Sequence, residues 1–174
     1  MLSRKFSKPT VVEMLNVSAI SENIRKELGF PLCEKDNQII HNEELICIGT
    51  KCSIVPSKDC GSLKHAGFFH SHTRGAFPSF SDLMLAYKTG LLCIGQNDGQ
   101  NANTIFCHER KSIEYDPKVY NDILQKGQET KKDIDEQIPK RIIDKKIILH
   151  NYFNTIVFRK KNDTNIIVSD YEYR

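Results

Sequence analysis

The alternation of short apolar runs with helix-like segments is the feature that most constrains the fold of this chain. Residues 66–69 are typical of a strand, and residues 91–95 form a continuous apolar run typical of a buried strand. Between them, residues 79–89 predict a helix that Gly90 ends. Because strands and helices alternate in this way along the chain, we expect an α/β fold with helices flanking a mixed central sheet.

The N-terminal part predicts a helix followed by short strands. Apolar residues three or four apart predict a helix over residues 11–28, with Ser21 and Glu22 as a cap of its second half and Gly29 as its end. The strands expected after it are 30–33, then 38–41 beyond a polar turn at 34–37, and a strand pair or one bent strand over 45–55.

The C-terminal part predicts one more strand, a helical region and a hairpin. Residues 104–108 are strand-like, and residues 117–145 predict two helices or one helix kinked at Pro139. Residues 147–159 and 165–171 predict a closing hairpin with a turn at 161–163.

Composition argues against several classes of function. The chain has 174 residues, which suits one domain, and its net charge of +3 is too small to indicate nucleic-acid binding. No stretch approaches the ~18 apolar residues of a membrane span. The basic N-terminus lacks the apolar core of a signal peptide, so we expect a cytoplasmic protein with reduced thiols. Nothing in the sequence indicates the oligomeric state.

The six cysteines do not form a structural zinc knuckle, because no pair has the two-residue spacing. Cys47, Cys93 and Cys107 lie inside apolar runs and are expected to be small buried hydrophobic residues. Cys52 and Cys60 could face each other across a loop, and the sequence leaves open whether they form a disulfide.

A candidate metal site lies between residues 70 and 82. His70 and His72 are two residues apart at the end of a predicted strand, so their side chains point the same way. Ser79 is a good helix N-cap, and Asp82 follows in the first helical turn. Two imidazoles and one carboxylate leave a fourth position for water, as in catalytic zinc sites, although iron or manganese would also fit the spacing. Each half of the pattern also has a purely structural interpretation, since Ser-x-x-Asp is a common capping arrangement.

The run His70-Ser71-His72, a loop, and Ser79-x-x-Asp82 resembles the motif of the JAMM (MPN+) family of zinc metallo-isopeptidases. The resemblance is specific over residues 67–95, although Thr73 replaces the usual proline and the loop is one residue shorter. It implies a single JAB/MPN-like domain with a metalloprotease core at 11–115. Residues 1–10 would be a tail, and residues 116–174 a helix and hairpin that complete the same domain.

The resemblance also implies a zinc-dependent hydrolysis of amide bonds, with a ubiquitin-like protein joined to lysine as the expected substrate. Zinc would be held by His70, His72 and Asp82, Ser79 would donate to the oxyanion, and a glutamate would be the general base. The family's spacing from glutamate to glycine is not reproduced before Gly29, so Glu27, Glu22 and Glu34 are candidates in that order. The alternatives are a non-catalytic scaffold of the same fold and a protein associated with DNA repair.

Overall fold

The computed structural model describes residues 5–42, 47–48, 60–72, 77–96, 104–129, 134–162 and 165–173. Within these residues, eight strands form one sheet in the order β2-β1-β4-β5-β6-β7-β8, with β3 paired to β1. The pair β4–β5 is parallel, and the other pairs are antiparallel. The expected α/β class with a mixed sheet flanked by helices is therefore confirmed. The strands are β1 (Leu28–Lys35), β2 (Gln38–His41), β3 (Cys47–Ile48), β4 (Lys64–Ser71), β5 (Leu91–Gln96), β6 (Thr104–Arg110), β7 (Phe153–Lys160) and β8 (Ile166–Tyr171).

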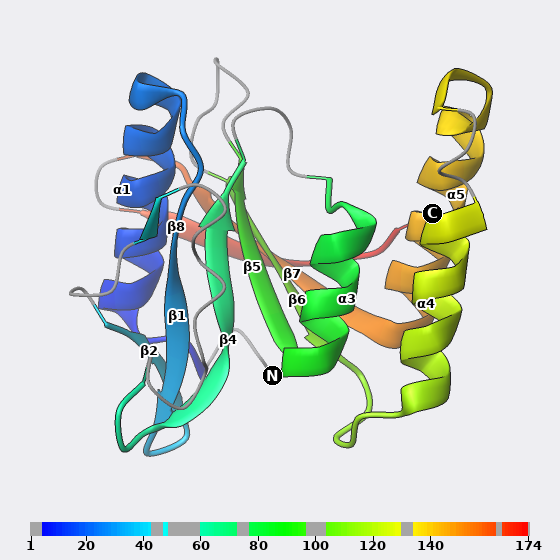
Figure 1. Ribbon diagram of the computed structural model, residues 1–174. Helices are drawn as coiled ribbons and strands as arrows, with labels where there is room; N and C mark the ends of the chain where they lie inside the picture. Colours follow the sequence, from blue (N-terminus) through cyan, green and yellow to red (C-terminus); the bar gives the residue numbers. More distant parts are fainter. Residues whose placement is uncertain are drawn as a thin grey trace.

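The helices divide between the two faces of the sheet. Figure 1 shows α1 (Lys8–Ile24) on one face and α3 (Phe80–Thr89), α4 (Pro117–Glu129) and α5 (Ile134–Tyr152) on the other. α3 connects the parallel strands β4 and β5. Strands β7 and β8, from the predicted C-terminal hairpin, extend the same sheet beyond β6.

The ends of α1 differ from the prediction. The helix begins at Lys8, inside the expected tail, because the Ser7 side chain accepts a hydrogen bond from the Thr10 backbone N–H. It ends at Arg25, which adopts the left-handed conformation with φ 55°. Ser21 therefore lies in the last turn instead of capping a second half, and Gly29 lies inside β1 instead of stopping the helix. Strand pairing, which the local sequence does not encode, decides where the helix must end.

The hairpin between β1 and β2 matches the sequence. Its turn residues Asp36 and Asn37 both have positive φ, 52° and 61°. Two consecutive left-handed residues form the tight turn that suits the twist of a two-stranded hairpin. Of the predicted strand region 45–55, only β3 lies within the described residues.

The C-terminal helices also begin and end elsewhere than expected. α4 ends at Glu129, α5 begins at Ile134, and residues 130–133 between them lie outside the described residues; Pro139 lies inside α5. The helix α5 continues to Tyr152, and the strand expected from residue 147 begins only at Phe153. A proline near the start of a helix removes one backbone hydrogen bond without ending it.

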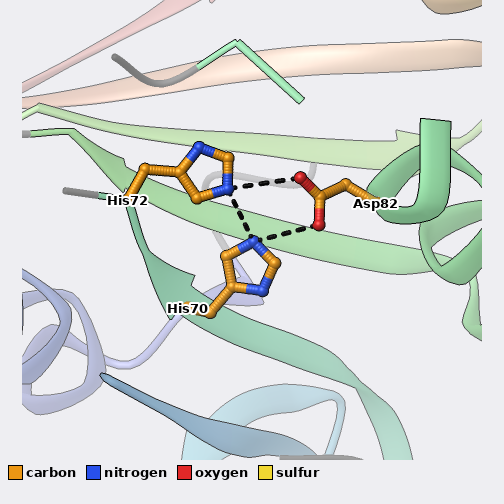
Figure 2. Close-up of side chains that lie close together, drawn as sticks. All are labelled: His70, His72 and Asp82. Carbon is orange, nitrogen blue, oxygen red and sulfur yellow. Dashed lines mark hydrogen bonds and ion pairs between the residues drawn. The ribbon is translucent and has the colours of Figure 1, made fainter. Parts of the chain in front are cut away.

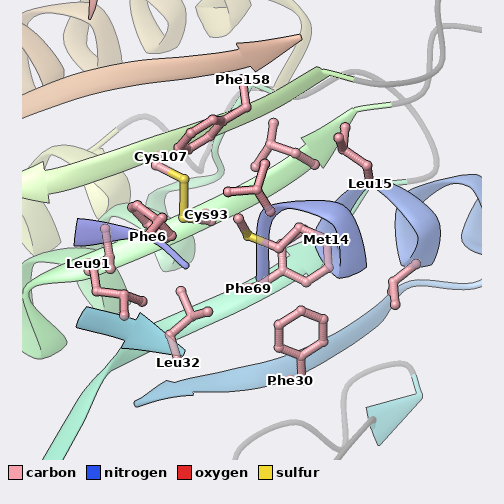
Figure 3. Packing of buried hydrophobic residues seen from close by; sticks show 14 of the residues in the cluster. Phe6, Met14, Leu15, Phe30, Leu32, Phe69, Leu91, Cys93, Cys107 and Phe158 are labelled. Atoms are coloured by element: carbon pink, nitrogen blue, oxygen red, sulfur yellow. A yellow bond between two sulfur atoms is a disulfide. The ribbon is translucent and has the colours of Figure 1, made fainter. Parts of the chain in front are cut away.

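Each face of the sheet has its own hydrophobic core. On the α1 face, residues from α1, β1, β4, β5, β6 and β7 pack together (Figure 3). On the other face, Phe68, Leu92 and Ile94 pack under α3, α4 and α5. Among the described residues, no helix is long and apolar enough to cross a membrane.

The cysteines pair differently from the expectation. Cys93 and Cys107 are fully buried as predicted, but they face each other across β5 and β6 and form a disulfide. Cys60 bonds to Cys33, with 5.7 Å between their Cα atoms. A Cys60–Cys52 bond is thereby excluded, and Cys52 itself lies outside the described residues. The expectation of reduced thiols was wrong for these four cysteines, because the sheet register and the return of the chain at Cys60 bring their sulfur atoms together.

Candidate metal centre

The end of β4 carries two histidines that face α3. His70 pairs with Gly29 of β1 on one side and with Ile94 of β5 on the other. His72 follows the last residue of β4, and its backbone N–H donates to the Gly95 carbonyl at 2.9 Å. This bond continues the alignment with β5, so the strand alternation places both imidazoles on the same face.

Gly29 makes room for this arrangement. A Cβ atom at Gly29 would lie 2.5 Å from the carbonyl oxygen of Phe69 and 3.1 Å from the Cβ of His70. Any larger residue would therefore push β1 away from β4 beside His70. The glycine is explained by this close approach of two strands.

The third residue comes from the first turn of α3. Ser79 is the N-cap, and its Oγ accepts from the Asp82 backbone N–H at 3.0 Å. The Asp82 carboxylate reaches back and accepts from the Ser79 backbone N–H at 2.9 Å through Oδ2. These two bonds form a capping box, which fixes the carboxylate over the start of the helix.

The three side chains converge on one point. The Nε2 atoms of His70 and His72 are 3.0 Å apart, and each lies 3.2 Å from a different oxygen of Asp82 (Figure 2). Ligand atoms around a tetrahedral zinc ion, each about 2.0–2.1 Å from the metal, are separated by roughly 3.3 Å. The side chains are only 13% to 19% exposed, so the group lies in a shallow, partly sheltered position.

This group could hold a metal ion. Two imidazole nitrogens and a carboxylate that aim their electron pairs at one point repel each other unless a cation or shared protons lie between them. The nitrogen and oxygen donors suit zinc, and three protein ligands leave one position of a tetrahedron open. The sequence expectation that His70, His72 and Asp82 come together is thus matched by the geometry.

The electrostatics keep Asp82 in its ligand form. Burial opposes ionisation of the carboxyl group, but hydrogen bonds to His70 and His72 outweigh that effect and hold the pKa of Asp82 well below its usual range. The carboxylate is therefore charged throughout the ordinary pH range.

Glu27, the first candidate base, lies just before the start of β1. Gly29 pairs with His70, and this is the last pair of the ladder between β1 and β4. Glu27 is exposed. Its carboxylate is not part of the described cluster of ligand atoms within 4.8 Å of one another. A general base acts on a water molecule and need not contact the ion.

The other two candidate bases occupy different positions. Glu34 pairs with Lys64 at the opposite end of β1 and β4, and its carboxylate lies 3.8 Å from the Lys64 ammonium group. That end is roughly 20 Å from His70 at the usual rise of a strand. Glu22 lies in the last turn of α1. Of the three candidates, Glu27 is the nearest in sequence to Gly29, which pairs with His70.

Two buried serines lie close to the site, and the sequence did not indicate that they contact each other. Ser71 and Ser21 are both 1% exposed and hydrogen-bonded to each other at 2.6 Å. They are 50 residues apart in the sequence, and no local pattern marks such a pair. Thr73, where the motif usually has proline, lies outside the described residues.

The sequence did not indicate a role for His108. It is fully buried on the α3 face, with Nδ1 2.8 Å from the Thr155 hydroxyl and no hydrogen-bond partner at Nε2 in the described structure. Burial lowers the pKa of His108 to about 3, although the negative charge of Asp82 acts in the opposite direction. The imidazole is therefore neutral at ordinary pH. The ring centroids of His65 and Phe68 are 4.6 Å apart.

No protein-family model matches this chain, and neither does any curated protein. Among solved structures, the chain is similar to the crystal structure of a JAB1/MPN domain protein from Archaeoglobus fulgidus. The two are 19% identical over 60% of this chain and 88% of the other, with a TM-score of 0.40. A likeness of this size transfers no activity, so any function must be argued from the side chains described above.

Proposed function

We propose that this chain is a zinc-dependent hydrolase of amide bonds, of the JAMM type that its motif resembles. The observation that supports the proposal is the convergence of His70, His72 and Asp82, whose three ligand atoms lie 3.0 to 3.2 Å apart. Zinc held there would lower the pKa of a bound water to about 7 and polarise a carbonyl group.

Glu27 is the general base of this proposal. It would take a proton from the attacking water and deliver it to the leaving amine. Its position two residues before Gly29, which pairs with His70, supports this role, and its exposure leaves the carboxylate accessible to substrate and water.

Ser79 is the proposed oxyanion donor. Its Oγ already accepts a hydrogen bond from the Asp82 backbone N–H, so the hydroxyl hydrogen remains available to donate. The same contact fixes the oxygen beside the proposed ligand Asp82. A donor held in advance stabilises the negative charge that develops on the carbonyl oxygen without further rearrangement.

The substrate class is proposed from the motif. We propose an isopeptide bond between the C-terminus of a ubiquitin-like protein and a lysine, or a peptide of similar extended shape. An extended tail can add as a strand to a sheet edge, and β8 is the last strand of the sheet within the described residues. Cleavage of lysine-linked ubiquitin-like conjugates, with and without a chelator, tests this part separately.

The metal assignment is tested by elemental analysis of the purified protein. We expect about one zinc per chain, and loss of nearly all of it in the double variant His70→Ala/His72→Ala. His150→Ala is the matched control, because His150 is exposed on α5, outside the metal cluster. Unchanged zinc content in the double variant would contradict the proposed site.

The catalytic assignment is tested with Glu27→Gln, which keeps the size of the side chain and removes its basicity. Zinc should remain bound while the turnover rate falls by about 10²–10⁴. Glu22→Gln and Glu34→Gln should leave the rate unchanged. A chain that binds zinc but cleaves none of the conjugates, with Glu27→Gln indistinguishable from the parent, would instead fit a metal-binding scaffold of the same fold.

A further inference from the structure

A chain of buried hydrogen bonds runs beneath the proposed metal centre. The Leu28 backbone N–H donates to Ser71 Oγ at 2.9 Å, and Ser71 Oγ donates to Ser21 Oγ at 2.6 Å. The Ser21 hydroxyl in turn donates to the Lys26 carbonyl oxygen. Because the Ser21 hydrogen is used in that last bond, Ser71 must be the donor in the contact between the two serines.

The two ends of this series of hydrogen bonds lie on either side of Glu27. The Lys26 carbonyl belongs to the peptide group that precedes Glu27, and the Leu28 N–H belongs to the peptide group that follows it. Both peptide planes that set the direction of the Glu27 side chain are thus hydrogen-bonded into one network. A second bond, from the Lys26 N–H to the Ser21 carbonyl, closes the turn that leads out of α1.

The network also includes the strand that carries the two histidines. Ser71 lies between His70 and His72, and its side chain points to the opposite face, toward α1. At this point the regular ladder between β1 and β4 has ended, and the Leu28 N–H bonds to a side chain instead of a backbone carbonyl. The hydroxyl of Ser71 therefore joins the segment of Glu27 to the strand of the two histidines.

Burial makes the network rigid. Ser21 and Ser71 are each only 1% exposed, so water cannot replace a missing partner. A buried polar group without a partner is unfavourable. Ser71 Oγ also lies 3.2 Å from the Leu28 carbonyl oxygen, a second contact that joins Ser71 to the residue after Glu27.

We propose that Ser71 and Ser21 are positioning residues that hold the Glu27 backbone in a fixed place relative to His70 and His72. The inference rests on the proposed function, because it concerns the direction of the proposed general base. Neither serine reaches the metal face. They act through the two peptide groups beside Glu27.

The test compares Ser71→Ala and Ser21→Ala with Ser18→Ala. Ser18 is a matched control, because it is a buried serine of the same helix whose hydroxyl bonds only to the Met14 carbonyl, at 2.8 Å. The first measurement is amide hydrogen exchange in the zinc-loaded protein. Exchange of the Leu28 amide should become at least about 10-fold faster in Ser71→Ala, and faster to a smaller degree in Ser21→Ala. It should be unchanged in Ser18→Ala.

The second measurement is steady-state hydrolysis of a lysine-linked ubiquitin-like conjugate, together with zinc content. We expect kcat to fall about 10- to 100-fold in Ser71→Ala and Ser21→Ala, with KM and zinc content preserved. Adding Glu27→Gln to Ser71→Ala should lower kcat no further than Glu27→Gln alone, since both changes disable the same base.

Three results would overturn the inference. These are an unprotected Leu28 amide in the parent protein, loss of zinc together with activity in Ser71→Ala, or a normal kcat in both serine variants. Failure of the proposed function has a different signature, in which Glu27→Gln and the parent protein behave identically in the assay. In that case the exchange of the Leu28 amide still decides whether the serines hold this segment.

Discussion

The two faces of the sheet are built from the same strands but use different chemistry. On the α1 face, the buried polar side chains Ser18, Ser21 and Ser71 are neutral hydroxyls, and a disulfide links Cys93 to Cys107. On the face of α3, the strands and the helix present imidazoles and a carboxylate, at His70, His72, Asp82 and His108. Neighbouring residues of β4 face opposite sides of the sheet. Phe69 and Ser71 point toward α1, whereas Phe68 and the histidines point toward α3.

This difference indicates how a small domain can keep a charged site without weakening its core. Hydroxyls and disulfides do not ionise in the ordinary pH range, so these groups contribute stability that does not depend on pH. On the other face, a metal ion or substrate could compensate the charge of the group formed by His70, His72 and Asp82. Stability and chemistry should therefore respond separately to changes on the two faces.

The largest expected effect is a loss of stability on the α1 face. Phe69 is 1% exposed and packs beside Phe30, with ring centroids 4.8 Å apart. Phe69→Ala should lower the free energy of unfolding by about 3–5 kcal/mol, because it removes a large buried ring and leaves a cavity. Urea denaturation measures the change, and zinc content of the folded fraction should stay the same.

The control for this change is Ile167→Ala on β8, where the side chain is 48% exposed. That variant should differ from the parent by no more than about 0.5 kcal/mol. If Phe69→Ala abolished zinc binding in protein that is still folded, the two faces would not be independent.

A change at the start of α3 should have its main effect on catalysis. In Ser79→Ala the lost oxyanion donor should raise the reaction barrier by about 2.7–4 kcal/mol, while the lost cap should reduce stability by only about 1 kcal/mol. Parallel measurements of kcat and of urea unfolding separate the two roles. A normal kcat with lowered stability would leave Ser79 as a helix cap alone.

The smallest of the three effects concerns pH. Because burial lowers the pKa of His108 from 6.5 to about 3, the unfolded chain binds a proton there over a range in which the folded chain does not. Stability is therefore greatest above about pH 6.5 and falls as the pH decreases toward 3. His108→Leu should remove about 2 kcal/mol of the stability difference between pH 7 and pH 5.

Urea unfolding at the two pH values measures this difference, and the parent and variant are compared by their pH dependence, not by their absolute stabilities. A His41→Leu variant is a useful comparison, because His41 lies on β2, away from the α3 face. Equal pH dependence in the parent and His108→Leu would mean that His108 is protonated inside the folded protein.

The parts of the fold that the sequence predicted are those with local signals. The turn at Asp36 and Asn37, the cap at Ser79 and the end of α3 at Gly90 each need only neighbouring residues. The group of His70, His72 and Asp82 could be predicted equally well, since a strand end and the first turn of the next helix bring these residues together without help from distant segments.

The sequence predictions were wrong where contacts between segments far apart in the sequence determine the structure. Arg25 ends α1 in a conformation more typical of glycine, because β1 begins three residues later, where Leu28 pairs with β3 and Gly29 with β4. The Cys33–Cys60 bond depends on where the chain returns, 27 residues later. The hydrogen bond between Ser21 and Ser71 also joins two segments that are far apart in the sequence.

The compact span of the proposed metal ligands has a consequence for how the protein matures. His70, His72 and Asp82 lie at the end of β4 and in α3, and β5 follows directly. Closing so short a loop is fast and has a small entropic cost compared with adding β7 and β8 from the far end of the chain. If the group binds zinc as proposed, a growing chain could capture the ion before synthesis of the last two strands is complete, and the ion would then favour the native order of the remaining strands.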